Sequence, residues 1–341
     1  MISPKPILRV QDLRLFFTSP KSSIEFSQGY TSADWFNGGA QGMAALCAQI
    51  ILEKRRDITI ALPGYFCGQT IRFLRSMRVN IIFYALTDSL SPDFTKLENQ
   101  LRHIELDIFV LVHYFGGVKA QKESKVFAEQ KNAILLEDCA HVVSYKDNRW
   151  LGDYLLFCPH KHFVSPPIGV LIGKISVAHG AKTKARQAVF PLIWVLKQLI
   201  RPTLKRRASL WGGVWSDVVE NFNDKLPNKH LINKSISYLE NCNDTVISRK
   251  KNTALLLERL MSVGGWRQFN AHSVSETPYV LAMICDNEEI AKSRYKKMNG
   301  QHSLVMQWPD LPVEIDQNKD VTSQTLFWLD RVLFFFIHQQ L

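Results

Sequence analysis

Along the first half of the chain, continuous apolar runs alternate with stretches of helical periodicity. The runs at 108–112 and 133–136 are apolar at every position rather than at every second one. This pattern is typical of strands that are buried on both faces. The alternation predicts an α/β protein with a mostly parallel sheet flanked by helices. We expect strands at 58–62, 80–84, 108–113, 133–137, 154–157 and 170–172, and helices at 40–54, 68–77, 94–101 and 121–130.

The second half has a different character. Residues 182 to about 229 are irregular, basic and rich in tryptophan, which favours a connector or a segment that flanks a site. A long helix fits 232–260, and the segments 279–285 and 326–337 suit strands of a smaller α+β domain. Because 341 residues exceed a typical single domain, we predict a large domain over residues 1–210. A connector and a smaller C-terminal domain are expected over 211–341.

Composition narrows the class of protein. Hydrophobic residues make up 46% of the chain and charged residues 21%, as in an ordinary globular protein. The first twenty residues contain charges and no signal-peptide core, so we expect a cytoplasmic chain that begins near Met1. The apolar stretch at 189–196 is too short to cross a bilayer. Six widely spaced cysteines without a C-x-x-C pair favour reduced thiols over a zinc site or disulfides.

The net charge of +11 is concentrated in one segment, 182–207, which carries eight basic residues and no acidic one. A solvated basic face is the favoured interpretation. An anion site for a nucleotide diphosphate and contact with an acidic membrane surface remain open alternatives. We do not expect nucleic-acid binding, because no recognisable nucleic-acid motif is present.

Polar residues at the carboxyl ends of predicted strands are the candidates for chemistry, since ligands of open α/β sheets bind there. Asp138 directly follows the strand at 133–137, where it either faces a crevice or caps a following helix. Lys161 follows the next strand. A lysine desolvated in such a place has a lowered pKa and can attack aldehydes; the alternative is a surface lysine in a loop. The flanking His160 and His162 lack nearby acids and do not predict a metal site.

Glycines open the helix predicted at 40–54, in the segment Gly38-Gly39-Ala40-Gln41-Gly42. Glycines before a helix let backbone amides approach a phosphate, and the helix dipole favours an anion there. The spacing matches neither a P-loop nor a dinucleotide fingerprint. An ordinary loop is therefore the alternative to an anion site.

Taken in order, these segments resemble the DegT/StrS family of sugar aminotransferases, which depend on pyridoxal 5'-phosphate (PLP). The order and spacing of the motifs over residues 35–173 carry the resemblance, and weaker matches recur in 230–341. The matching segments are 42–46 (family G-T-A-A-L), 62–67 (P-x-Y/F-T-x), 111–116 (V-H-x-x-G), 134–141 (E-D-A-A-H/Q), 157–161 (F-x-x-x-K), 166–169 (P-x-x-G-G) and 336–340 (P-I/L-H-x-x).

The resemblance implies a fold-type-I PLP transferase that forms a homodimer and acts on a nucleotide-linked keto sugar, with an amino acid as amino donor. By the same resemblance, Lys161 would form the internal aldimine and Asp138 would pair with the pyridine nitrogen of the cofactor. His141 would lie beside the cofactor, and the helix start near Gly42 and Met43 would take its phosphate. Cys67 stands at the position where the family often stacks an aromatic ring on the cofactor, and the aromatic residue Phe66 is adjacent to it.

The sequence departs from the family at the phosphate site. Met43 replaces a threonine, and Leu156 replaces a serine that binds phosphate. Each lost hydroxyl donor could cost about 1–3 kcal/mol of cofactor binding. A non-catalytic or regulatory homologue that partners an active enzyme is therefore the alternative function. A sugar dehydratase of the same fold is a third, but there a histidine replaces the lysine, and Lys161 argues against it.

Overall fold

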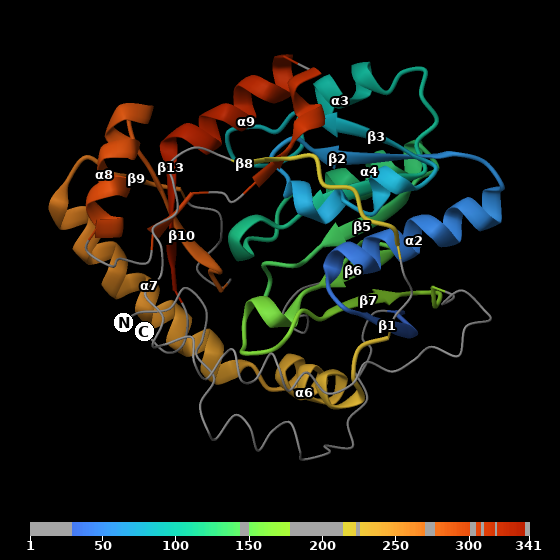
Figure 1. The fold of residues 1–341 in the computed structure, drawn as a ribbon, viewed down its shortest axis with the longest axis horizontal. Coiled ribbons are helices and arrows are strands. Elements are labelled where there is room, and N and C mark those ends of the chain that lie inside the picture. The colour runs from blue at the N-terminus through green and yellow to red at the C-terminus, as the bar shows by residue number, and fades with distance from the viewer. Residues whose placement is uncertain are drawn as a thin grey trace.

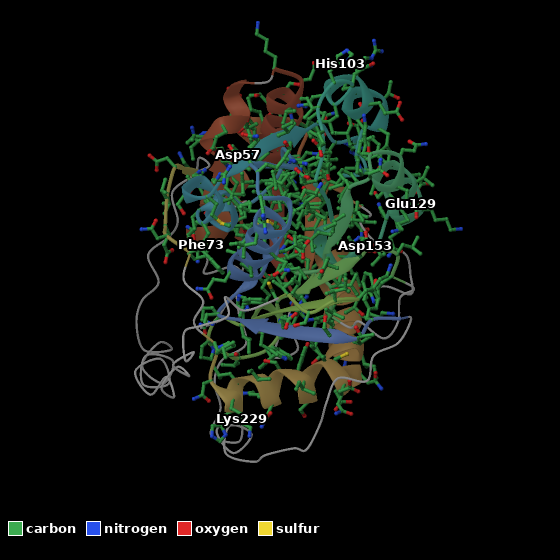
Figure 2. All side chains as sticks on the ribbon, turned by 90° about the vertical axis from the view of Figure 1, so that its right-hand side faces the viewer. Asp57, Phe73, His103, Glu129, Asp153 and Lys229 are labelled. Atoms are coloured by element: carbon green, nitrogen blue, oxygen red, sulfur yellow. The ribbon has the colours of Figure 1, made fainter. Side chains whose placement is uncertain are left out.

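The computed structural model describes residues 29–143, 150–177, 214–222, 226–269, 277–300, 305–307, 310–317 and 319–337. The basic segment 182–207 lies outside these residues, and so does the end of the match at 336–340. Within the described residues, no helix is long and apolar enough to cross a membrane. The molecule is elongated, with His103 near one end and Lys229 near the other (Figure 2).

A seven-stranded sheet dominates the structure, in the order β1-β7-β6-β5-β4-β2-β3. Strands β2 to β6 pair with one another in parallel, whereas β7 is antiparallel to both β6 and β1. The predicted parallel sheet is thereby confirmed, with each predicted strand found to within one residue at either end. The bounds are β1 Ser32–Phe36, β2 Ile58–Pro63, β3 Val79–Tyr84, β4 Ile108–Val112, β5 Ile134–Asp138, β6 Tyr154–Phe157 and β7 Gly169–Gly173. Strand β1 was not predicted; it is a five-residue segment held by antiparallel pairing to β7.

Helices cover both faces of this sheet. Helix α2 (Gly39–Lys54) packs on β1, β2, β6 and β7, and α4 (Gln121–Gln130) packs on β4 and β5. Successive residues of a strand face opposite sides. Accordingly, Leu156 belongs to the main core, while Leu155 belongs to a second core cluster that includes residues of α6. Helix α6 (Lys229–Glu240) runs below β1 and β7 in Figure 1.

Some predicted helices differ in the structure. Helices α2, α3 (Phe94–Gln100) and α4 confirm the predictions at 40–54, 94–101 and 121–130. The predicted helix at 68–77 is instead two short 3₁₀ turns, η1 (Gly68–Ile71) and η2 (Leu74–Ser76). The long helix predicted at 232–260 is two helices, α6 and α7 (Asn243–Val263). The break falls at Asn241, whose backbone is not helical and whose side chain favours turns over helix interiors.

A smaller antiparallel sheet, of order β11-β13-β10-β9, lies beside α7 and α8 on the left of Figure 1. The predicted strand at 326–337 is wrong up to residue 331, because helix α9 (Lys319–Arg331) extends to that residue. The buried positions of α9 have helical spacing: Val321, Thr325, Trp328 and Leu329. The other bounds are β9 Arg267–Gln268, β10 Val280–Ile284, α8 Glu288–Gly300, β11 Val305–Met306, η6 Val313–Gln317 and β13 Val332–Phe336.

A parallel pair, β8 (Val214–Ser216) with β12 (Asp310–Pro312), forms a third sheet. The main hydrophobic core is continuous between the two halves of the chain, since it holds Leu62 and Phe109 together with Trp328 and Phe334. The predicted domain boundary near residue 210 falls outside the described residues, so the division into 1–210 and 211–341 stays a prediction.

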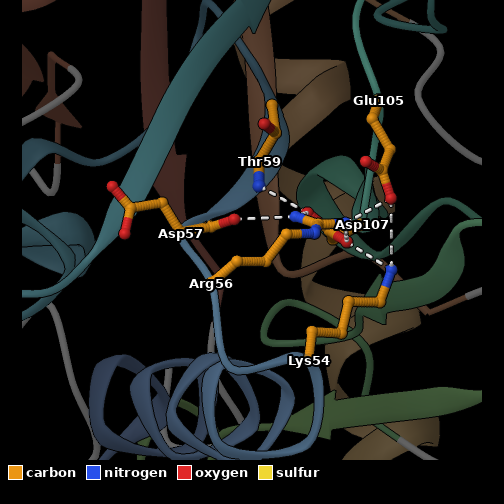
Figure 3. Close-up of polar contacts among 6 residues, drawn as sticks. All are labelled: Lys54, Arg56, Asp57, Thr59, Glu105 and Asp107. Carbon is orange, nitrogen blue, oxygen red and sulfur yellow. Dashed lines mark hydrogen bonds and ion pairs between the residues drawn. The ribbon is translucent and has the colours of Figure 1, made fainter.

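A buried carboxylate secures the amino-terminal edge of the large sheet (Figure 3). Asp107 is 2% exposed and accepts hydrogen bonds from the Thr59 backbone at 2.7 Å, Lys54 Nζ at 2.5 Å and Arg56 Nη2 at 2.8 Å. Burial alone would raise the pKa of Asp107, but the hydrogen bonds from Arg56, Lys54 and Thr59 outweigh it and hold that pKa below its usual value. The ionised carboxylate therefore stabilises the fold.

We predict that Asp107→Asn lowers the free energy of unfolding by about 1–3 kcal/mol at neutral pH, because charged hydrogen bonds are lost. The folded pKa is depressed, so this stabilisation is present above the unfolded pKa of about 4 and disappears as pH falls through the folded pKa. Urea unfolding of parent and variant should accordingly converge in acid. Asp57→Asn is the control, because Asp57 pairs with Arg78 at an exposed site and should change stability by less than about 1 kcal/mol. A constant difference at every pH would contradict the assignment.

Candidate active site

The carboxyl ends of parallel strands meet at one edge of the large sheet, where ligands of such sheets bind. Strand β5 ends at Asp138, and β6 leads into the 3₁₀ turn η4 (Pro159–Lys161). Strands β5 and β6 are adjacent and parallel, with Asp138 opposite Leu156. The structure thereby places Asp138 and Lys161 at the same edge, as the sequence predicts.

Lys161 is partly buried, and its amine makes no hydrogen bond or ion pair with any described residue. Burial lowers the pKa of this amine, as expected. Four nearby groups raise it by more, and the net pKa lies above the usual value; these groups are Cys158, Tyr279, Asp138 and Cys67. The predicted net lowering of the Lys161 pKa is therefore wrong, because the amine lies among groups that become anionic when they ionise.

Asp138 is 8% exposed, and its Oδ1 accepts a hydrogen bond from the Ala140 backbone at 2.9 Å. Burial raises the pKa of Asp138, and the nearby Lys161 offsets only part of that rise. Residues 139–143 form turns rather than a helix, so within this described segment Asp138 does not cap a helix. It is a buried carboxylate with an electrostatic partner in Lys161.

The preceding residue, Glu137, has a structural role that sequence analysis missed. Its side chain is fully buried and binds His113 Nε2 at 2.7 Å, Gln121 Nε2 at 2.8 Å and the Leu151 backbone at 2.8 Å. Burial raises the pKa of Glu137, but these contacts, that of His113 foremost, bring it below its usual value. Because neighbouring side chains of a strand point to opposite faces, Glu137 anchors one side of β5 while Asp138 faces the other.

His141 lies in the turn after Asp138, between two aromatic rings. Tyr279 stacks on it with ring centres 4.5 Å apart, and Phe115 stacks at 6.1 Å. Burial lowers the pKa of His141 well below its usual value, and Lys161 and His162 add to this effect. The imidazole is thus neutral at physiological pH. Tyr279 comes from the C-terminal half of the chain, and no signal in the sequence pointed to it.

The first turn of α2 approaches β6 very closely at two glycines. A Cβ added to Gly39 would lie 2.6 Å from Cys158 Sγ, and one added to Gly42 would lie 2.9 Å from Leu156 Cδ1. The N-cap residue of α2 is Gly38, and no side chain caps the first amides of the helix. The uncapped end of α2 therefore meets β6 just before Lys161, at the edge that also holds Asp138.

The remaining predicted site residues are placed differently. Met43 is fully buried, Phe66 is 4% exposed, and both belong to the main hydrophobic core. Cys67 is partly buried, interacts electrostatically with Lys161, and donates a hydrogen bond to Asp310 Oδ1 at 3.4 Å. Asp310 was not predicted; it is buried and also accepts from the Gln69 backbone at 3.0 Å. Electrostatic interactions thus connect Lys161 with Asp138, His141 and Cys67, and Gly42 packs against Leu156 on the adjacent strand. The side chains of Met43 and Phe66 lie in the main hydrophobic core, and their role in binding a cofactor stays a prediction.

His160 and His162 do not form a metal site with other described residues, among which no group of three or more suitable ligands occurs. His160 contacts the Ile168 carbonyl at 2.7 Å, and the buried His162 ring meets Tyr279 edge-on at 5.3 Å. Both histidines therefore contact other parts of the protein.

No family model and no curated protein sequence matches the chain. Solved structures do match in three dimensions. Helicobacter pylori PseC, an aminotransferase involved in the biosynthesis of pseudoaminic acid, is 12% identical, with a TM-score of 0.67 over 99% of this chain and 93% of PseC. A DegT DnrJ EryC1 StrS aminotransferase from Brucella abortus is 10% identical, with a TM-score of 0.62 over 91% of this chain and 82% of that one.

A third similar structure is E. coli GDP-4-keto-6-deoxy-D-mannose-3-dehydratase with bound hydrated PLP. It is 16% identical, with a TM-score of 0.62 over 96% of this chain and 86% of the dehydratase. At these identities the likeness establishes a shared fold. The chain therefore has the fold of the fold-type-I PLP aminotransferases, as predicted.

Proposed function

We propose that the chain is a PLP-dependent aminotransferase acting on a nucleotide-linked keto sugar, with an amino acid as donor, in polysaccharide or secondary-metabolite synthesis. The observation that carries this proposal is the placement of a lysine amine and a buried carboxylate, Lys161 and Asp138, at the ends of adjacent parallel strands, where they interact electrostatically beside His141. The similar structures add support, because one is an aminotransferase involved in the biosynthesis of pseudoaminic acid and another is a GDP-4-keto-6-deoxy-D-mannose-3-dehydratase with bound hydrated PLP. The same proposal includes that the enzyme forms a homodimer and is located in the cytoplasm.

The residues present suit PLP, which supplies an aldehyde for amine exchange and an electron-withdrawing pyridine ring. Lys161 would hold the aldehyde carbon covalently, and Asp138 would keep the pyridine nitrogen protonated. The uncapped amides of α2 would bind the phosphate through the backbone and the helix dipole. Since the pKa of the Lys161 amine is raised, the amine must lose a proton before it can attack a carbon.

Asp138 gains from its desolvated position. A carboxylate with few competing water molecules interacts more strongly with a cation than one in solvent does. The raised pKa of Asp138 is the price of that burial, and a protonated pyridine nitrogen would offset it. His141, neutral and fixed between two rings, would orient a bound ring without adding charge.

One observation favours the alternative function, a non-catalytic homologue. Leu156, where the family has a serine, lies against the first turn of α2 and is 1% exposed. A phosphate there would receive no hydroxyl donor from β6. The absorbance spectrum of purified protein distinguishes the two functions: a chain that never develops the absorbance of lysine-bound PLP, even with PLP added, supports the regulatory one.

Lys161→Ala should abolish covalent fixation of PLP by borohydride, because no other described lysine lies beside Asp138 at this edge. The measurement is mass spectrometry of peptides after reduction in the presence of PLP. Lys174→Ala is the control, since Lys174 pairs with Asp153 at an exposed position and should leave fixation unchanged. If PLP is fixed with equal yield on a different lysine in the Lys161 variant, the site is assigned wrongly.

Asp138→Asn should reduce the rate of transamination at least about a hundredfold, as loss of one buried stabilising contact often does, because an amide cannot keep a pyridine nitrogen protonated. Stability should not fall, since burial raises the pKa of Asp138 and its charge opposes folding. Single-turnover kinetics and thermal unfolding measure the two effects. The control is Asp153→Asn. Asp153 lies directly before β6, and its carboxylate accepts a hydrogen bond from the Leu135 backbone in β5. Turnover equal to that of the parent in the Asp138 variant would contradict the role.

Leu156→Ser should tighten PLP binding by about 1–3 kcal/mol if the new hydroxyl reaches the phosphate, while lowering stability by about 2–5 kcal/mol through the cavity that it leaves. Leu155→Ser is the matched control: Leu155 is equally buried but belongs to the other core cluster. The measurement is titration of each variant with PLP. Equal PLP affinity of Leu156→Ser and Leu155→Ser would refute the predicted tighter binding.

A further inference from the structure

Tyr279 covers one face of His141. The two rings are nearly parallel, 10° apart with centres separated by 4.5 Å, and Phe115 covers the opposite face at 13°. The same tyrosine meets His162 edge-on and acts electrostatically on the Lys161 amine. One side chain from the C-terminal half thus contacts both His141 and His162.

The peptide of Phe115 links His141 to Tyr279. Its N–H donates to His141 Nδ1 at 3.4 Å, and its carbonyl accepts from the Tyr279 N–H at 2.6 Å. Since Nδ1 accepts, the proton of the neutral imidazole resides on Nε2. Phe115 adopts a left-handed conformation, φ 58°, which is unfavourable for a bulky residue and persists only where the surroundings impose it. Such strain is characteristic of functional sites.

The backbone that carries Tyr279 cannot shift readily toward Phe115. A Cβ added to Gly116 would lie 2.2 Å from the Thr277 carbonyl oxygen, and Gly116 itself has a φ of +101°. Only glycine fits at this position, for reasons of both conformation and space. The segment 277–279 is therefore pressed against the end of β4, and the Tyr279 side chain is set by that contact.

Arg249, on α7, holds the same segment from the other side. It is 2% exposed, its Nη1 donates to the carbonyls of Tyr279 at 3.1 Å and Pro278 at 3.5 Å, and its guanidinium lies 5.9 Å from the centre of the Tyr279 ring. No carboxylate of the described residues pairs with it. A buried cation is costly, and in this structure the hydrogen bonds of Arg249 Nη1 run to backbone carbonyls of the segment that carries Tyr279. It is therefore placed to hold the backbone.

We propose that Tyr279 is a further residue of the Lys161 site, which fixes the orientation of His141 and forms the wall beside the Lys161 amine, and that Arg249 is its positioning residue. The part that concerns Lys161 rests on the proposed function. The part that concerns His141 rests only on the contacts above. Docking of the segment 277–279 onto Phe115 and Gly116 thus completes the site with a residue from outside the large sheet.

The orientation of His141 can be tested without cofactor, by histidine-selective NMR titration of the full-length chain. In the parent, His141 should stay neutral to well below the usual histidine pKa of about 6.5. Tyr279→Ala should admit water and move the His141 pKa toward that value, whereas Tyr279→Phe, which keeps the ring, should not. Tyr279→Leu keeps the apolar volume of the side chain but lacks a flat ring, so it replaces Tyr279→Ala in this test if thermal unfolding shows the alanine variant to be unstable. It should also raise the His141 pKa.

Arg249→Met should produce the same change in His141 as Tyr279→Ala, though smaller. Arg294→Met is the matched control, because Arg294 likewise holds a carbonyl, that of Gly264 at 3.0 Å, and packs on Trp266, away from Lys161. It should leave His141 unchanged. If the His141 titration is ordinary in the parent, or identical in the parent, Tyr279→Ala and Tyr279→Leu, the proposal is overturned.

A second measurement separates this proposal from the function on which it partly rests. Titration with PLP should show binding to the parent and at least about fivefold weaker binding to Tyr279→Ala, the size expected for loss of an aromatic contact. A parent that never binds PLP, with a clear His141 change in the variants, would refute the proposed function and leave the positioning role standing. Equal PLP affinity in parent and variant would refute the wall beside Lys161.

Discussion

Parallel pairing of β5 with β6 is the constraint on which the rest of the site depends. It puts Asp138 opposite Leu156 and sends the chain from β6 directly into the turn that carries Lys161. Both glycines of the first turn of α2 then permit that helix to lie against the same strand. If the register of β6 slipped by one residue, Leu155 would face α2 instead of Leu156, since side chains alternate along a strand, and the helix end would no longer meet the lysine turn in this arrangement.

Buried charges fall into two groups with different meanings. Asp107 and Glu137 each accept several hydrogen bonds, have pKa values below the usual ones, and hold strands in place. Asp138 has a raised pKa and a single hydrogen bond, and the Lys161 amine makes none with the described residues. Carboxylates of the first group stabilise the protein. In the second group, the raised pKa of Asp138 means that its charge opposes folding, whereas the raised pKa of Lys161 means that the fold favours the charged amine.

The two halves of the chain meet at the aromatic cluster around His141. Phe115 and His141 come from the loops after β4 and β5, and Tyr279 comes from the segment before β10. Each is buried or partly buried, and the backbone of Phe115 bonds to both of the others. This arrangement makes the site depend on how the smaller sheet docks, because Arg249 on α7 holds the Tyr279 backbone.

The sequence by itself determined the large sheet, the helices on its faces, and the positions of Asp138 and Lys161, because continuous apolar runs and strand-end polar residues are local patterns. It did not determine the break at Asn241 or the end of α9, where an apolar run fits either a helix or a strand. Nor could it show that Met43 points into the core, that Glu137 and Asp138 have separate roles, or that the Lys161 pKa is raised. Tyr279, Arg249 and Asp310 reach the site from more than 85 positions beyond Lys161. Only tertiary packing brings such residues together, because their contacts depend on the docking of distant segments and leave no periodic trace in the chain.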